Sequence, residues 1–435
     1  MGWFPQEALN EGVRKREVFG WAMYDFANSG YTTVVLTAVF NAYFVGVVAR
    51  GASWATLAWT LCIAVSSAIT MVTVPALGAH ADLRAAKKRV LGWTTAGCVA
   101  ATLALAWCGE GDVALAAVAV VVSNVFYSYG EALNAAFLPE LARREAIGRV
   151  SGWGWSFGYF GGMLSLGLSL GYVLWAQQQG QPATQFVPVT MLITAAVYAV
   201  ASLATFALLK ERALACAAPA GASPPAGGVR AALSRLLQTG RDARRYRDFA
   251  WLLACGTAYQ AGIAVVIALA AVYAEQALGF EQTQTMALVF AVNIASAAGA
   301  FLFGYWQDKA GHKLALSTTL VGWIAMTLMA FVATTPGLFW AAAVLAGLCM
   351  GSSQSAGRAL TGLLAPAERL AEFFGLWTFA TRLAAIIGPL TYGLVTWLTA
   401  GNHRLAILST AVFFIAGLVL LRPVDLQRGM RAARH

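Results

Sequence analysis

The chain alternates long apolar stretches with short polar segments along its whole length, and this pattern restricts its fold more than any other feature. A helix needs about 20 apolar residues to cross a bilayer, and only helices or closed barrels satisfy their backbone groups in lipid. Stretches of that length fall at 19–46, 54–79, 90–108, 113–138, 151–176 and 186–209, and again at 249–274, 283–307, 314–333, 338–364, 373–398 and 403–421. We therefore predict an all-α membrane protein with twelve transmembrane helices in two six-helix bundles.

The positions of the cationic residues predict the orientation. Twenty-five of the 29 Lys and Arg residues lie before the first stretch, after the last, or in the alternate loops that share their side of the membrane. Lys and Arg concentrate on the cytoplasmic side of membrane proteins. We expect both termini in the cytoplasm and a bacterial inner (plasma) membrane location. The same placement explains the net charge of +10 without a nucleic-acid partner.

Motifs for cofactor or metal chemistry are missing from the sequence. The six cysteines include no Cys-x-x-Cys pair, the four histidines lack metal-ligand spacing, and no phosphate-binding Gly-x-x-x-x-Gly-Lys-Ser/Thr loop occurs. We expect no enzymatic activity, no cofactor and no metal. Transport by such a chain would be driven by a gradient rather than by ATP.

One segment divides the chain near its middle. Residues 210–247 begin rich in Ala, Pro and Gly and end rich in Arg, with Leu233, Leu236 and Leu237 at helical spacing. This second part is either an amphipathic helix on the cytoplasmic leaflet or a solvated linker. The predicted domains are an N-terminal bundle at 1–209, a cytoplasmic linker at 210–247, and a C-terminal bundle with a short tail at 248–435.

The two halves repeat each other. A shift of 226 residues aligns Gly78, Asp82 and Lys87 with Gly304, Asp308 and Lys313. A shift of 227 residues aligns Pro139, Glu145, Gly148 and Gly161 with Pro366, Glu372, Gly375 and Gly388. Parallel repeats of this kind are related by an axis along the membrane normal and form a site between the bundles near mid-membrane.

Several motifs resemble a known family. The loop from Gly304 through Asp308 to Lys313 resembles the signature of the major facilitator superfamily, and Gly78, Asp82 and Arg84 form a weaker copy. The runs at 24–29, 138–141, 158–162 and 373–376 resemble the vacuolar amino-acid effluxer-like branch. The resemblance implies the major facilitator fold, and it implies gating roles for Asp82 and Asp308, which would brace the inner helix ends. Gln260-Ala261-Gly262 stands where that branch would have an Asn-Asp-Gly-like step.

Four ionisable residues lie inside the predicted membrane helices, where each costs about 2.5–3.5 kcal/mol. The acids Asp25 and Glu131 belong to the first half, and the bases Arg358 and Arg382 belong to the second. Two readings stay open. In the first, Glu131 and Arg358, equivalent under the 227-residue shift, pair across the cleft as a cytoplasmic gate. In the second, the arginines bind a substrate carboxylate while Asp25 or Glu131 carries the coupling proton.

Uncharged residues complete the predicted site. Asn28 shares a helix face with Asp25, and Asn134 shares one with Glu131. Tyr159 and Gln354 are further candidates for substrate binding, whereas Trp153 and Trp155 are expected to be interfacial anchors. We expect a monomeric, proton-coupled secondary transporter for a small carboxylate-bearing or zwitterionic solute such as an amino acid or short peptide, in contact with membrane lipids. Export of an amphiphile, or lipid handling, is the alternative.

Overall fold

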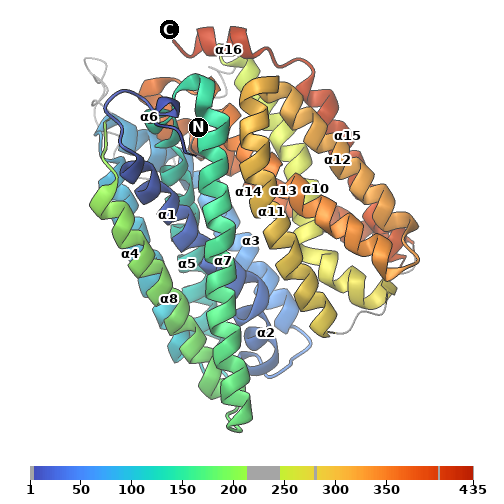
Figure 1. Cartoon of the computed structure of the whole chain (residues 1–435). Coiled ribbons are helices and arrows are strands. Elements are labelled where there is room, and N and C mark those ends of the chain that lie inside the picture. The colour runs from blue at the N-terminus through green and yellow to red at the C-terminus, as the bar shows by residue number, and fades with distance from the viewer. Residues whose placement is uncertain (1–3, 213–244, 279–281, 400–401, 435) are drawn as a thin grey trace.

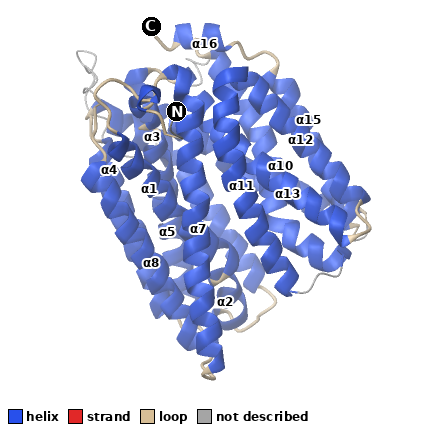
Figure 2. Cartoon of the chain, in the orientation of Figure 1, coloured by secondary structure: helices blue, strands red, loops and turns tan. Residues whose placement is uncertain are grey.

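The computed structural model describes residues 4–212, 245–278, 282–399 and 402–434. Within these ranges the regular structure is helical (Figure 2), apart from one antiparallel bridge between Leu9 and Ala142. The predicted amphipathic helix of the linker lies mostly at 213–244, outside the described residues. The domain boundaries therefore stay a prediction.

The first half of the chain supplies six membrane-spanning helical segments. A short turn, η1 (Gln6–Ala8), precedes them. The elements are α1 (Lys15–Tyr31) continued by η2 (Thr32–Ala38), α2 (Phe40–Tyr43) and η3 (Phe44–Val48); α3 (Ala55–Leu83); α4 (Lys87–Ala104) with η4 (Leu105–Trp107); α5 (Val113–Ala135) with α6 (Leu138–Leu141); η5 (Arg144–Ala146) with α7 (Ile147–Gln178); and α8 (Ala183–Leu208).

The second half repeats this arrangement. Its elements are α10 (Arg247–Leu278), α11 (Gln282–Ala310), α12 (His312–Val332), α13 (Pro336–Leu364), η6 (Ala367–Arg369), α14 (Leu370–Leu398), α15 (His403–Leu421) and α16 (Leu426–Ala432). In the described residues, twelve segments are long and apolar enough to cross a membrane, and each corresponds to one of the predicted stretches. The prediction of twelve membrane helices is confirmed.

Both ends of the chain lie at one face of the molecule, which we call the termini face (Figure 1). The short helix α16 lies across this face. The halves pack together mainly through α7 against α11 and α3 against α14, with further contacts from α13 to α7 and from α14 to α5. In Figure 1 the ribbons of α7 and α11 come together towards the termini face and separate away from it.

The two halves touch backbone to backbone near the termini face. A side chain added at Gly78 of α3 would place its Cβ 2.2 Å from the Ala371 carbonyl oxygen of α14. One added at Gly152 of α7 would lie 2.3 Å from the Ala300 carbonyl oxygen of α11. Real Cβ atoms do not approach carbonyl oxygens so closely, so both seams require glycine. The structure is thus closed between the halves at this face.

Candidate functional site

Two ion pairs join the halves inside the membrane-spanning part of the molecule. Asp25 of α1 and Arg358 of α13 approach to 2.5 Å between Oδ2 and Nη1, and both residues are buried. Glu131 of α5 and Arg382 of α14 approach to 3.4 Å between Oε2 and Nη2. The acids come from the first half and the bases from the second. All four residues proposed from the sequence therefore take part in contacts between the halves.

Arg358 uses its whole guanidinium in contacts with the first half. Besides Asp25, it donates from Nε to the Ser151 hydroxyl at 3.2 Å and from Nη2 to the Ser151 carbonyl oxygen at 2.7 Å. Its guanidinium carbon also lies over the ring of Trp21, at 4.7 Å from the centroid, and over that of Trp155, at 5.2 Å. Charge-assisted hydrogen bonds and cation–π contacts in a dry environment are strong, so this arginine is held firmly.

Asp25 is fixed by its other neighbours. Asn134 donates from its side-chain amide to Oδ1 at 3.0 Å, and the Trp21 indole donates to the Asn134 carbonyl oxygen at 2.8 Å. At Gly154 an added Cβ would lie 2.6 Å from both Asp25 Oδ2 and the Arg358 guanidinium. The lack of a side chain at Gly154 therefore creates the space in which the pair forms.

The second pair is looser and more open. Glu131 exposes 35% of its side chain and Arg382 exposes 17%, against 13% and 7% for Asp25 and Arg358. Arg382 lies over the Tyr127 ring at 5.8 Å, and its Nε has no hydrogen-bond partner among the described residues. A 3.4 Å contact between charged groups is long for a charge-assisted hydrogen bond. Both groups thus retain capacity for another ligand.

The predicted pairing of Glu131 with Arg358 is wrong. Arg358 is paired with Asp25 instead. Glu131 reaches Arg382 on the facing helix, and the same 227-residue shift turns this contact into that between Arg358 and Trp155. The two contacts therefore occupy equivalent places in the repeat but differ in residue type, because the first half has Trp155 where the second half has Arg382.

The structure places the remaining candidates around these pairs. Gln354 exchanges side-chain hydrogen bonds with Gln260, at 2.7 and 3.3 Å. Tyr159 lies on α7, with its ring 6.0 Å from that of Trp155. Asn28 is buried on α1, one turn from Asp25. No described contact joins Gln354, Tyr159 or Asn28 directly to the four charged residues.

Trp21 and Ser151 were not among the predicted site residues, although both contact Arg358. Each lies one helical turn from a residue that had been singled out, Trp21 from Asp25 and Ser151 from Trp155. Helical spacing alone would have found Trp21. The expected interfacial position of Trp153 and Trp155 is wrong: Trp153 is buried, and Trp155 stacks on Arg358.

Two carboxylates cap helices of the opposite half at the termini face. Asp82 accepts from the backbone N–H groups of Ala371 and Glu372 at 3.1 and 3.0 Å. Asp308 accepts from those of Gly148 and Arg149 at 2.9 and 3.2 Å. In both cases these are the second and third residues of the helix, where the helix dipole favours an anion.

The two caps differ in one contact. The Arg149 side chain donates from Nε to Asp308 at 2.7 Å, whereas the corresponding helix position beside Asp82 holds Glu372, which is paired with Arg369. The Asp308 cap therefore contains an additional charge-assisted hydrogen bond. Both carboxylates bridge the halves directly, as a gating role requires.

The fold defines the class of protein. The structure resembles the human organic anion transporter MFSD10 with a TM-score of 0.74 at 15% identity, over 96% of this chain and 100% of that one. It resembles the proton:xylose symporter XylE with a TM-score of 0.68 at 14% identity, over 94% and 95%. The chain has the major facilitator fold and is an integral, multi-pass membrane protein.

Sequence comparison gives the family. A family model for vacuole effluxer Atg22-like proteins matches residues 41–434, and the chain belongs to this family of transporters. It is 27% identical over 408 residues to the uncharacterized MFS-type transporter YxiO of Bacillus subtilis (strain 168), covering 92% of this chain and 93% of that protein. It is 24% identical to autophagy-related protein 22 of Yarrowia lipolytica, covering 72% of this chain and 56% of that longer protein.

Proposed function

We propose that the protein is a proton-coupled carrier that moves a small zwitterionic solute, an amino acid or short peptide, by alternating access. The observation that carries this proposal is the open Glu131–Arg382 pair. An amino acid bears an ammonium and a carboxylate group only a few bonds apart. A solute of this kind can enter between Glu131 and Arg382, with its carboxylate on the guanidinium and its ammonium group donating a hydrogen bond to the carbonyl oxygen of the protonated Glu131 side chain.

The two ion pairs have different roles in this proposal. Arg358 is saturated by Asp25, Ser151 and two aromatic rings, so binding a solute there would require several strong contacts to break. The Asp25–Arg358 pair therefore serves as a lock that holds the halves together. Arg382, with an unpartnered Nε and a long contact to Glu131, serves as the carboxylate-binding group.

Glu131 is the proposed proton carrier. When its carboxylate is protonated, Arg382 loses its internal counter-charge and becomes a stronger site for an anionic group. When the proton leaves, Glu131 attracts Arg382 again and displaces the solute carboxylate. Proton and solute thus bind and leave together, which is the requirement for coupled transport.

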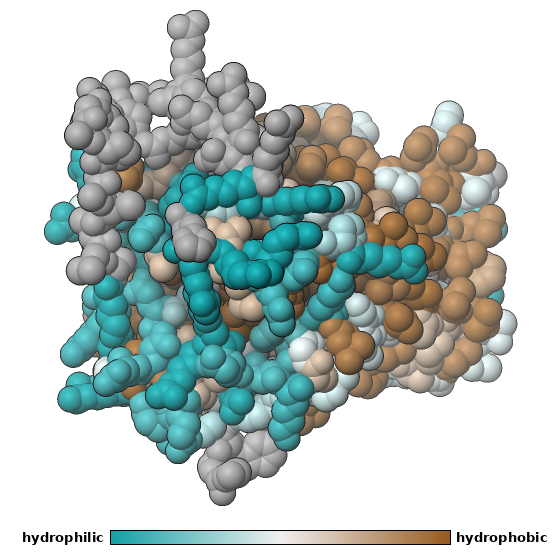
Figure 3. Space-filling model, turned by 90° about the horizontal axis from the view of Figure 1, so that it is seen from above, coloured by the Kyte–Doolittle hydropathy of each residue, from teal (hydrophilic) through white to brown (hydrophobic). Residues whose placement is uncertain are grey.

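The direction of transport follows from the orientation. We propose that the termini face is cytoplasmic in a bacterial inner membrane, because most of the Lys and Arg residues belong to segments on that side. Figure 3 shows hydrophilic side chains gathered over a large part of this face. A proton gradient directed inwards would then drive uptake of the solute.

A ligand screen on the purified protein tests this proposal. Thermal unfolding is followed with the common amino acids, dipeptides, and matched analogues that lack either the amino group or the free carboxylate. We expect a zwitterion to stabilise the protein, and both matched analogues to lose the effect. The Arg382→Gln variant should lose it too, whereas Arg50→Gln, which removes an exposed ion pair with Glu110, should keep it.

Other results would favour the alternatives. Stabilisation by amphiphilic cations, unaffected by Arg382→Gln, would indicate an exporter of amphiphiles. Stabilisation by phospholipid alone, with no response to any small solute, would indicate lipid handling. Either pattern would contradict the zwitterion proposal.

A further inference from the structure

A pocket of about 670 Å³ opens at the termini face, away from the ion pairs of the membrane interior. It lies between the turn that joins α3 to α4 and the chain just after α8. The lining residues are Arg84, Ala85, Ala86, Lys88, Arg89, Phe206 and Glu211. Three are cationic and one is acidic, so the lining carries a positive excess.

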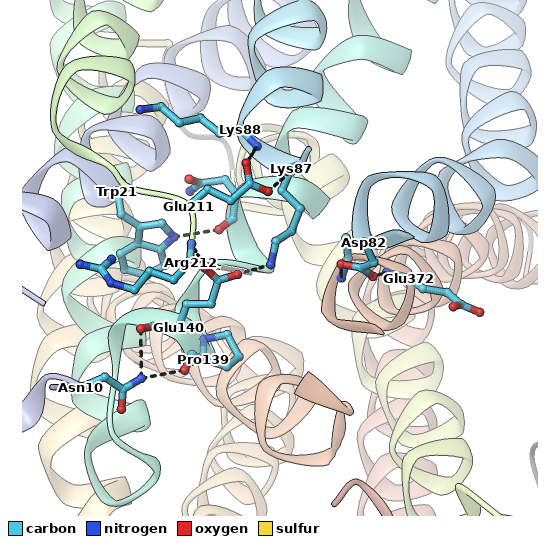
Figure 4. A network of polar contacts seen from close by, with 12 residues as sticks. Asn10, Trp21, Asp82, Lys87, Lys88, Pro139, Glu140, Glu211, Arg212 and Glu372 are labelled. Atoms are coloured by element: carbon cyan, nitrogen blue, oxygen red, sulfur yellow. Dashed lines mark hydrogen bonds and ion pairs between the residues drawn. The ribbon is translucent and has the colours of Figure 1, made fainter. Parts of the chain in front are cut away.

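The acid of the pocket is already engaged. Glu211 accepts with its two carboxylate oxygens from the backbone N–H groups of Lys87, at 2.6 Å, and Lys88, at 3.1 Å (Figure 4). It caps the start of α4 rather than neutralising a side chain. Arg84 and Arg89 are exposed, and neither side chain has a hydrogen bond or ion pair to another residue in the described part of the chain. Their charges are available to an anion.

An apolar surface continues from the pocket towards the membrane interior. Phe206 forms part of the lining, and a Cβ added at Gly92 of α4 would lie 3.8 Å from its ring, so α4 and α8 lie side by side here. Deeper by one or two turns, Trp93 exposes 74% of its surface and Leu203 exposes 65%. Tryptophan at such a position is typical of the membrane–water interface.

We propose that this pocket binds the phosphate of an anionic phospholipid, with Arg84 and Arg89 as its main ligands and one acyl chain along the surface between α4 and α8. Cations beside an exposed apolar surface match a molecule with an anionic head and a hydrocarbon tail. A free phosphate ion would use the cations alone and leave the apolar surface without a role. This inference does not depend on the substrate of the carrier.

Native mass spectrometry of the detergent-purified protein, titrated with dioleoylphosphatidylglycerol or dioleoylphosphatidylcholine, tests the site. We expect the anionic lipid to be retained more tightly. The double variant Arg84→Gln/Arg89→Gln should weaken its retention by about thirtyfold, since each cation near an anionic lipid contributes roughly fivefold. Lys15→Gln/Arg16→Gln, which removes two exposed cations from the same face, is the matched control and should retain the lipid as the unmodified protein does.

Three results would overturn the proposal. The first is equal retention of the two lipids by the unmodified protein. The second is equal loss of the anionic lipid in the pocket variant and the control variant. The third concerns the source of the phosphate: displacement of the lipid by inorganic phosphate at a similar concentration would indicate a soluble anion. An unchanged midpoint of thermal unfolding in the pocket variant checks that it is folded.

Discussion

Arg358 of the second half lies 2.5 Å from Asp25 of the first, although its counterpart in the repeat is Glu131. The contact joins α13 to α1 across the interface between the halves. It is reinforced by Ser151 and by cation–π contacts of Arg358 with the Trp21 and Trp155 rings. Separating a buried ion pair of this kind leaves each charge without its counter-charge, which is energetically costly. In the proposed function this pair is the lock that holds the closed arrangement at the termini face.

The first prediction concerns this pair. Asp25→Asn or Arg358→Gln leaves the other charge buried without its counter-charge, so each single variant should lose about 3–5 kcal/mol of stability. The double variant Asp25→Asn/Arg358→Gln should recover most of that loss. Thermal unfolding of the purified variants measures the coupling. A loss of stability in the double variant equal to the sum of the losses in the two single variants would show that Asp25 and Arg358 do not act as a pair.

The second prediction separates the two arginines. Arg382→Lys should weaken solute binding about tenfold or more, because an ammonium group cannot replace the planar, two-pronged guanidinium. Arg358→Lys should alter the stability of the protein and the balance between its conformations. It should leave unchanged the affinity for the solute of the state that is closed at the termini face. Isothermal titration with the stabilising solute measures both variants. A loss of affinity in Arg358→Lys alone would reverse the proposed assignment of lock and binding site.

The charge-swapped variant Glu131→Arg/Arg358→Glu provides the third prediction. Because these residues are not partners, exchanging them places a second acid beside Asp25 and a second base beside Arg382. Transport and stability should therefore fall below those of either single variant. Recovery of transport in the swapped protein would mean that Glu131 and Arg358 pair directly during the cycle.

The fourth prediction concerns the helix caps at the termini face. Asp308→Asn should open this face more than Asp82→Asn, since it also leaves Arg149 without its acceptor. Hydrogen bonds to charged groups contribute about 1.5–3 kcal/mol each. Spin-label distances between α7 and α11, and between α3 and α14, report the opening. Equal changes of the spin-label distances in Asp308→Asn and Asp82→Asn would show that the hydrogen bond from the Arg149 side chain does not help to keep this face closed.

The positions of the helices could be predicted from the sequence because lipid imposes a simple rule of length and hydropathy. The repeat also predicted that Asp82 and Asp308 have parallel roles, and both carboxylates cap a helix of the opposite half. The caps fall at positions that differ by one turn under the shift, since α14 begins one turn earlier than α7. Sequence equivalence fixes which helices meet, but not the register of their contacts.

The partners of the four charged residues could not be predicted for a similar reason. Helical spacing placed Asp25 and Glu131 on polar faces, and charge balance required bases opposite them. Which acid pairs with Arg358 and which with Arg382 depends on the direction of the side chains and on the space around them. At Gly154, for example, any side chain would collide with the Asp25–Arg358 pair. Ser151 gives no sequence signal of its own, because its backbone carbonyl is one of the groups that Arg358 uses.

Coupling of the proton to Glu131 is the central claim, and transport by Glu131→Gln in proteoliposomes tests it most directly. The solute is the one that stabilises the unmodified protein best, and Arg50→Gln is the control. The account predicts that Glu131→Gln exchanges labelled solute across the membrane but no longer accumulates it under an imposed proton gradient. Accumulation by Glu131→Gln at the level of the control would contradict the account.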